Sequence, residues 1–398
     1  MATTAPLLQK LRLADRMSRL GTESAFDVLV RAKALEAAGR EIIHLEIGEP
    51  DFPTAMQIVE AGVDALRYGW THYGPSAGLP ALREAVAEDA ARRRGISIDP
   101  AEVVITPGAK PIMFFVILAL IDRDDEVIYP NPGFPIYESM INFVGGRPVP
   151  YGLREEHDFD VDAGEIIGKI TDQTRLVILN SPHNPTGGVL PRESVAELAK
   201  ALDGRDLFIL SDEIYSRLIY QGEHASIAQF PGMKERTIIL DGFSKTYAMT
   251  GWRLGYGIMR PDLAERVAQL QTNATSCTAS FTQMAAVTAL RGDQDCVDEM
   301  REEFRQRRSV IVDGLNKIPG FRCRQPQGAF YAFPNITGTG RQSKALSDAL
   351  LNEAGVAALS GTAFGTWGEG HLRFSFANSV ENIQKALDWI GTWVKRNL

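Results

Sequence analysis

Residues 241–255 read DGFSKTYAMTGWRLG and directly follow the apolar run Thr237–Leu240. Such a run is typical of a buried strand, so Lys245 lies just beyond the end of that strand. Burial lowers the pKa of a lysine and makes its amine a usable nucleophile, and the forked guanidinium of Arg253 suits a phosphate. Taken alone, such a pair would more often be a surface lysine and a structural arginine.

On both sides of this stretch, short apolar runs alternate with helical patterns such as Ser194–Leu202. The expected strands are Val103–Thr106, Glu126–Tyr129, Leu176–Asn180, Leu207–Ser211, Thr237–Leu240 and Gly255–Met259. This alternation predicts βαβ units, and therefore an α/β fold with a mostly parallel sheet flanked by helices. Ligands of such sheets bind beyond the carboxyl ends of the strands.

The two ends of the chain follow another pattern. A helical pattern at Asp27–Ala38 precedes an expected strand at Ile42–Ile47. Near the C-terminus, Ser379 is a candidate N-cap for a last helix. Its apolar face consists of Ile383, Leu387, Ile390 and Val394. We therefore expect a large domain over residues 49–290, and a smaller α/β domain built from residues 1–48 and 291–398.

Composition excludes several classes of protein. The chain has 398 residues, 44% of them hydrophobic, and a net charge of −8. The acidic balance argues against a nucleic-acid partner, and we expect the arginines of 92–94 and 305–308 to lie on solvated helix faces. The three cysteines and six histidines have no metal-ligand spacing, so we expect no metal. With no signal-peptide core and no membrane-length apolar run, we expect a cytoplasmic protein without a membrane partner.

Four other segments carry polar residues where strands are expected to end. The turn Ile105–Pro111 contains Lys110 and opens a helix, so its backbone amides could bind phosphate, although an ordinary βα turn would look similar. Asn180–Gly188 predicts a rigid turn. Asp212 is either a helix N-cap or a functional carboxylate. Arg373 lies on the face of a strand opposite the apolar residues, either to bind a carboxylate or to face solvent.

Taken together and in this order, these segments resemble the fold-type-I pyridoxal-phosphate (PLP) aminotransferases of class I/II. The resemblance extends from about residue 20 to 390. The residues that carry it are Gly48–Phe52, Asn184–Gly187, Asp212–Tyr215, Gly242–Lys245, Gly251–Gly255 and Arg373.

The resemblance implies three catalytic residues. Lys245 would form the Schiff base with PLP and act as the acid and base of the proton shift. Asp212 would pair with the pyridine nitrogen, because a protonated pyridinium is a better electron sink. Tyr215, together with Asn184, would hydrogen-bond the phenolic oxygen of the ring.

The resemblance also implies how cofactor and substrate are held. Arg253 would bind the phosphate with the amides of Ala109 and Lys110, and Phe134 would stack on the ring. Arg373 would hold the substrate α-carboxylate, with Asn184 and the backbone of Gly48. Tyr73 resembles the tyrosine that reaches the phosphate from the other subunit, which implies a homodimer with shared active sites.

Three positions depart from the commonest pattern of that family. Gly242 replaces a phosphate-binding serine, so either Ser244 compensates or Arg253 and backbone amides suffice. Phe134 replaces a tryptophan or tyrosine. Asn273 aligns with an arginine of aspartate-specific members, which favours neutral or aromatic substrates over a strict preference for dicarboxylates. We expect the remaining specificity residues in the N-terminal segment, in residues 273–280 and on the partner subunit.

Three functions are compatible with this resemblance. The first is an aminotransferase that moves an amino group between an L-amino acid and a 2-oxo acid through a PLP ping-pong cycle. The second is a PLP-dependent lyase or synthase, which would keep the same lysine, aspartate and arginine. The third is a regulator that binds PLP without turnover; we expect too few residues before the matching region for the DNA-binding domain of such regulators.

Overall fold

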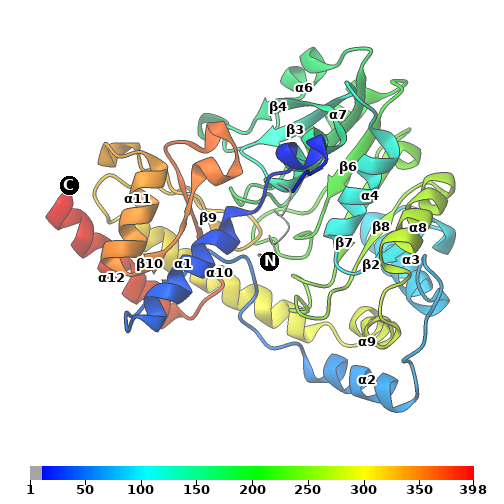
Figure 1. Ribbon diagram of the computed structural model, residues 1–398, viewed down its shortest axis with the longest axis horizontal. Helices are drawn as coiled ribbons and strands as arrows, with labels where there is room; N and C mark the ends of the chain where they lie inside the picture. The colour runs from blue at the N-terminus through cyan, green and yellow to red at the C-terminus, as the bar shows by residue number, and fades with distance from the viewer. Residues whose placement is uncertain (1–10) are drawn as a thin grey trace, which may run out of the picture.

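The computed structural model describes residues 11–398, and its centre is a seven-stranded sheet with the order β2-β8-β7-β6-β5-β3-β4 (Figure 1). The strands are β2 Val103–Thr106, β3 Glu126–Asn131, β4 Arg147–Gly152, β5 Thr174–Asn180, β6 Phe208–Asp212, β7 Thr237–Gly242 and β8 Gly255–Ile258. All neighbours run parallel except β8, which is antiparallel to both β2 and β7. The predicted strands and the mostly parallel sheet are confirmed. The sequence pattern missed β4, an edge strand, because two prolines interrupt it.

Helices cover both faces of this sheet, and the alternation of side chains along each strand decides which face they meet. Leu176, Ile178 and Leu210 pack with helices α4, α5 and α8, whereas Val177 and Ile209 pack with α6 and α7. Helices α2, α3 and α9 cover the part of this second face beside β2, β7 and β8. The helices of this region are α2 Met56–Arg67, α3 Pro80–Arg94, α4 Lys110–Leu120, α5 Ile136–Val144, α6 Ala163–Lys169, α7 Arg192–Leu202, α8 Pro261–Thr275 and α9 Ser280–Arg291.

The ends of the chain build a second region beside the large sheet (Figure 1). Its strands are β1 Ile43–His44, β9 Tyr331–Ala332, β10 Val356–Ala357, β11 Leu359–Ser360 and β12 Leu372–Ser375. Strand β12 lies between β11 and β9, and β1 and β10 form a two-stranded sheet. The helices here are α1 Ser24–Ala37, α10 Asp295–Leu315, α11 Ser343–Ala349 and α12 Val380–Asn397.

The terminal helix confirms its sequence pattern. The Ser379 side chain caps α12 by accepting a hydrogen bond of 3.2 Å from the Asn382 amide, and its apolar face packs on α10. Strand β1 is shorter than the expected Ile42–Ile47 because the chain leaves the β10 partner after His44. The division into domains at residues 49 and 291 stays a prediction, with which the location of the two groups of strands is consistent.

The arginine-rich segments differ from expectation. Arg92 and Arg305 are exposed, but Arg94, Arg307 and Arg308 are buried, so the prediction of solvated helix faces is wrong for these three. Each has a partner from a distant part of the chain, for example Asp51 at 2.6 Å from Arg307 and the Pro326 carbonyl at 2.9 Å from Arg308. Such partners permit burial of a charge, and no local pattern reveals them.

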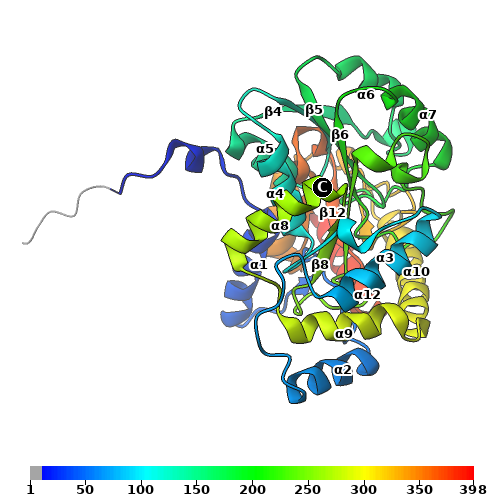
Figure 2. The same cartoon turned by 90° about the vertical axis from the view of Figure 1, so that its right-hand side faces the viewer.

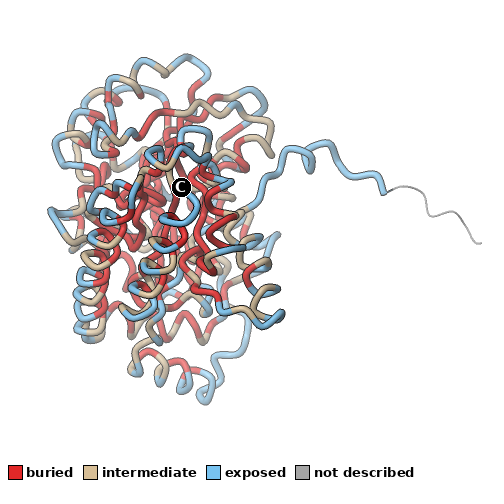
Figure 3. The backbone as a smooth tube through the Cα atoms, turned by 90° about the vertical axis from the view of Figure 1, so that its left-hand side faces the viewer, coloured by how far each residue is buried: buried red, intermediate tan, exposed pale blue. Residues whose placement is uncertain are grey.

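The first described residues, 11–20, lead away from the body of the molecule (Figure 2). Residues 11–20 extend beyond the rest of the fold in Figure 2 and are exposed along their length in Figure 3, in contrast to the buried strands of the sheet. Arg19 and Gly21 attach this segment to α5 through the Asn142 carbonyl and the Ser139 hydroxyl. Among residues 11–398 we find no helix with the length and apolar character needed to cross a membrane.

Candidate active site

A cavity of about 550 Å³ opens where β5, β6 and β7 end, between the large sheet and strand β12. The predicted residues that line it are Gly48, Ala109, Lys110, Phe134, Asn184, Asp212, Tyr215, Ser244, Lys245, Arg253 and Arg373. Asn184, Asp212 and Lys245 lie at or after the ends of β5, β6 and β7, and they meet here because the carboxyl ends of parallel strands lie at one sheet edge. The second region adds Arg373 from β12.

Lys245 reaches into this cavity from the turn that follows β7. Its Nζ donates a hydrogen bond of 2.6 Å to the Gly48 carbonyl and lies 5.9 Å from the centre of the Phe330 ring. Burial lowers the pKa of Lys245 to about 8, against a partial opposing effect of the Glu49 carboxylate. A larger fraction of the amine is therefore neutral near physiological pH than for an exposed lysine.

Asp212 is the last residue of β6 and is 8% exposed. Its Oδ2 accepts a hydrogen bond of 2.6 Å from the Tyr137 hydroxyl, and its Oδ1 accepts one of 3.3 Å from the Ile214 amide. Burial raises the pKa of Asp212 to about 6, although the Tyr137 hydrogen bond acts in the opposite direction. A turn and no helix follows, so the N-cap alternative is wrong for this residue.

Arg373 is 4% exposed, so the alternative of a solvated strand face is wrong. Its Nη1 donates to Asn184 Oδ1 at 3.0 Å, its Nη2 donates to the Glu46 carbonyl, and its guanidinium lies 4.4 Å from the centre of the Tyr331 ring. The planar group is thus oriented before any ligand arrives, which reduces the entropy lost on binding a carboxylate.

Two tyrosines form a pair beside this arginine. The hydroxyls of Tyr215 and Tyr331 lie 2.7 Å apart, and burial raises the pKa of both. Both phenols are therefore protonated hydrogen-bond donors at neutral pH. A side chain at Gly48 would place its Cβ 2.1 Å from the Tyr331 hydroxyl, so only glycine permits this approach of the two segments.

The turn between β2 and α4 forms an anion cradle with Arg253. Gly108 has φ +92°, which favours glycine, and a Cβ there would lie 2.3 Å from Arg253 Nη2, so the guanidinium would have to move. The Thr106 hydroxyl donates to the Gly108 carbonyl at 2.7 Å and shapes the turn. The first amides of α4 have no partner within the helix, and they carry the positive end of its dipole.

The model of the family described as Aminotransferase class I and II matches residues 40–390. The chain belongs to this family. It is 40% identical to an aspartate aminotransferase of Pyrococcus horikoshii over 96% of this chain and 97% of that protein. It is 39% identical to aromatic-amino-acid aminotransferase 2 of Thermococcus litoralis, over 95% and 97%. The solved aspartate aminotransferase of Rhizobium meliloti has a TM-score of 0.93 at 35% identity, over 97% of this chain and 100% of that chain.

These matches confirm the predicted family, the α/β fold of its large sheet and the class of reaction. The enzyme is a PLP-dependent aminotransferase, which transfers an amino group between an amino acid and a 2-oxo acid.

The cavity fits the chemical groups of PLP. The cradle at Gly108 offers amides and a guanidinium to a phosphate, Asp212 offers a buried carboxylate to the pyridine nitrogen, and Lys245 offers an amine to the aldehyde. The half-buried ring of Phe134 lines the same cavity and is available to stack on an aromatic ring.

Two predicted residues lie elsewhere. Tyr73 is 89% exposed and does not line the cavity of its own chain, as expected of a residue that would act in a partner subunit. Asn273 lies on α8, exposed, with its Nδ2 donating to the Gln269 carbonyl at 2.9 Å. It does not line this cavity either.

Sequence reasoning missed several residues of the site. Tyr137 and Tyr331 contact Asp212 and Tyr215, but each lies in an apolar segment and therefore resembles a core residue. Glu23 and Phe26 line the cavity from the start of α1, and Glu23 pairs with Lys110 at 2.5 Å. Both lie in the N-terminal segment, where specificity residues were expected, and their part in specificity stays a prediction.

Proposed function

We propose that Lys245, Asp212 and Arg373 carry out transamination in this cavity. The observation that carries the proposal is the Lys245 amine, desolvated and directed into a cavity that also contains a buried carboxylate and an oriented guanidinium. When bound, PLP supplies a carbonyl that exchanges with the amino group and a ring that accepts electrons from the substrate Cα–H bond.

The residues of this chain would then divide the work. Arg373 binds the substrate α-carboxylate, and Asn184, already hydrogen-bonded to it, fixes its position. Lys245 would take the proton from the substrate Cα onto Nζ as a general base and later release it as a general acid. Asp212 holds a proton at the pyridine nitrogen, Tyr215 with Asn184 would hydrogen-bond the ring oxygen, and Tyr137 keeps the Asp212 carboxylate oriented.

The phosphate would be held by Arg253 and the α4 amides of Ala109 and Lys110. Ser244, 9% exposed in the same cavity, would replace the phosphate-binding serine of the family, for which this chain has Gly242. Phe134 would cover one face of the ring. Together these groups would fix the cofactor so that Lys245 meets the reacting carbon in one geometry.

We infer a preference for neutral or aromatic side chains. Phe26, Ile47 and Phe134 line the cavity, and Glu23 neutralises Lys110. Aspartate is the second candidate, because Lys110 is 46% exposed and could exchange Glu23 for a substrate carboxylate. Both kinds of substrate occur in the names of the relatives, aspartate for one and aromatic amino acids for the other.

We also infer a homodimer with shared active sites. Large apolar side chains are exposed in two N-terminal segments, including Leu11 at 80%, Val30 at 69%, Tyr68 at 81% and Tyr73 at 89%. Exposed apolar surface of this kind is typical of an interface, and a second copy of the chain would cover it. Tyr73 would then reach the phosphate of the partner's site. The cytoplasmic location is likewise inferred, with support from three free cysteines.

The first test is the visible absorption of the PLP-loaded enzyme mixed with one amino acid and no 2-oxo acid. We expect leucine and phenylalanine to bleach the band once, with one equivalent of amino acid consumed per cofactor. Aspartate should bleach it more slowly. Replacing Lys110 with alanine should reduce the rate of bleaching with aspartate. The rate with phenylalanine should stay within about threefold of that of the wild-type enzyme. Continuous release of ammonia without a 2-oxo acid would instead identify a lyase.

The lowered pKa of Lys245 predicts how cofactor loading depends on pH. Below its pKa of about 8 the amine is protonated and cannot attack the PLP aldehyde. The rate at which apoenzyme regains its visible band should therefore rise roughly tenfold per pH unit up to about 8 and level off above. The reference is Nα-acetyl-lysine, whose rate should keep rising toward pH 10. An enzyme curve that follows the reference would show that Lys245 is not desolvated.

A further inference from the structure

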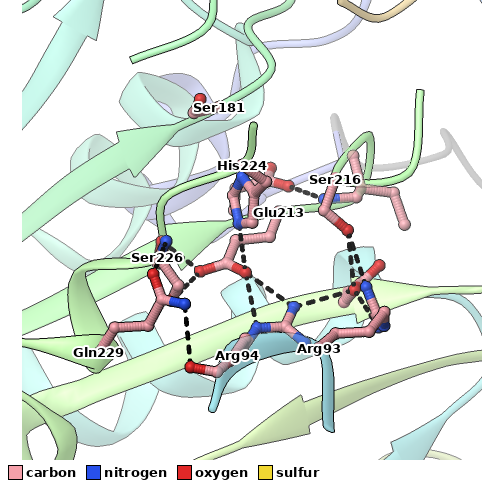
Figure 4. A network of polar contacts seen from close by, with 12 residues as sticks. Arg93, Arg94, Ser181, Glu213, Ser216, His224, Ser226 and Gln229 are labelled. Atoms are coloured by element: carbon pink, nitrogen blue, oxygen red, sulfur yellow. Dashed lines mark hydrogen bonds and ion pairs between the residues drawn. The ribbon is translucent and has the colours of Figure 1, made fainter. Parts of the chain in front are cut away.

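A buried network of charges surrounds Glu213 (Figure 4). We call it the Glu213 network. It consists of Asp89, Arg93, Arg94, Ser211, Glu213, Ser216, His224, Ser226, Asp241 and Tyr256. None of these residues lines the cofactor cavity.

The centre of the network is the ion pair of Glu213 with Arg94, the last residue of α3. Glu213 Oε2 lies 2.8 Å from Arg94 Nε and 2.7 Å from Arg94 Nη2. Arg94 Nη2 is also 3.1 Å from Asp241 Oδ2. These three residues are between 0% and 3% exposed. One guanidinium therefore joins two carboxylates that belong to adjacent strands.

Both carboxylates are adjacent to the catalytic segments. Glu213 directly follows Asp212, and Asp241 lies in β7 immediately before the Gly242–Lys245 turn. Side chains alternate along a strand, so Asp212 faces the cavity and Glu213 faces α3. The Glu213 amide also donates to the Leu240 carbonyl at 2.8 Å, which continues the pairing of β6 with β7 beyond Asp212.

Further hydrogen bonds reach both carboxylates, whereas two buried nitrogens of the network, Arg94 Nη1 and His224 Nδ1, have no partner among the described residues. Glu213 Oε1 accepts from Ser211 at 2.9 Å and from Ser226 at 2.5 Å, and Oε2 contacts His224 Nε2 at 2.7 Å. Asp241 Oδ1 accepts from the Gly242 amide at 2.7 Å, at the start of the lysine turn. Arg93 adds contacts to Asp89, Ser216, Asp241 and Tyr256.

Stability alone is a weak reason for such a network. Desolvation of buried charges offsets most of their attraction, and apolar residues of similar volume are often as stable or more so. A network in which most groups are bonded does, however, fix the relative position of the segments that it joins. Here the joined segments are the ends of the strands that carry Asp212 and Lys245.

We propose that the Glu213 network is a positioning device, which fixes Asp212 relative to Lys245 for the transamination reaction. The inference rests on the proposed function, because it takes these two residues as the catalytic pair. Glu213 itself touches neither substrate nor cofactor and acts through the strand ends. Its charge also contributes to the field at Asp212, since an anion one residue away favours protonation of nearby groups.

The test is the variant Glu213→Gln, which keeps the size of the side chain and removes its charge. In the PLP-loaded enzyme we expect kcat to fall about 100-fold, the loss that a misplacement of about 1 Å produces. KM should change less than about threefold, because Arg373 is untouched. The absorption of the bound cofactor changes with pH, and the pH at which this change is half complete (the midpoint) should be lower than in wild type, because a nearby anion is lost.

Two further variants separate positioning from stability. Glu126→Gln is the matched control, because Glu126 is a 4% exposed carboxylate at the amino end of β3, away from the cavity. It should lower the melting temperature and leave kcat and the midpoint unchanged. The double variant R94M/E213M replaces the pair by apolar side chains. Its melting temperature should be higher than that of Glu213→Gln, whereas its kcat should be as low as that of Glu213→Gln.

Several results would overturn the proposal: an unchanged kcat and midpoint in Glu213→Gln, the same shifts in Glu126→Gln, or a double variant that regains kcat together with its melting temperature. If Glu213→Gln does not fold, the double variant provides the test. A low kcat in R94M/E213M would support the proposal, and a kcat near that of wild type would contradict it. A failure of the proposed function would look different, because wild-type enzyme would then lack the visible band or its response to amino acids.

Discussion

Replacing Lys245 with alanine should abolish transamination while the protein still binds PLP non-covalently. Lys245 is the amine in the cavity that can remove and return the substrate proton, and general acid–base catalysis alone contributes up to about 10⁴-fold. We expect a loss of at least that size in kcat. The measurement is steady-state turnover with excess PLP, together with the visible spectrum of the desalted protein.

The matched control is Lys234→Ala. Lys234 is also a partly buried lysine, paired with Glu102 at 2.9 Å and outside the cavity lining. Its replacement should leave turnover and spectrum within about threefold of wild type. If Lys245→Ala retained full activity, the assignment of the catalytic lysine would be wrong. If its biological effect persisted without turnover, a PLP-binding regulator would regain support.

Replacing Arg373 with alanine should weaken substrate binding and leave the visible band of the cofactor intact. The side chain would make charge-assisted hydrogen bonds to the α-carboxylate, and their loss costs about 2–4 kcal/mol, or ~30- to 1000-fold. The loss should occur in kcat/KM for every amino acid tested, because all share the α-carboxylate. Circular dichroism should show a folded protein, since Asn184 and the Glu46 carbonyl lose only one partner each.

Arg373→Lys is the matched variant for this prediction. It keeps the positive charge but cannot make two parallel hydrogen bonds to a carboxylate. We expect it to fall between wild type and Arg373→Ala in kcat/KM. An effect below about threefold for Arg373→Ala would mean that another residue holds the carboxylate.

The sequence by itself determined the fold class and the family, and it predicted nearly half of the described residues that line the cavity. Strand patterns are local, and the residues that follow a strand in a parallel sheet must lie at its carboxyl edge. Asp212, Lys245 and Asn184 could therefore be placed near each other before any coordinates. Asn184 and its partner Arg373 are 189 residues apart in the sequence. The resemblance to the family predicted that both belong to one site.

Only the tertiary structure decided which groups surround these residues. Tyr137 is an aromatic residue on an apolar helix in the sequence, yet its hydroxyl lies 2.6 Å from Asp212. Arg94 belongs to a run of three arginines that resembles a solvated helix end, yet it is buried against Glu213, 119 residues away. Burial of such groups depends on partners supplied by other strands and helices, because an unpaired charge would remain in water. The periodicity of a sequence indicates which face of a helix or strand is apolar. Only the packing of the whole chain determines which polar groups contact one another in the interior.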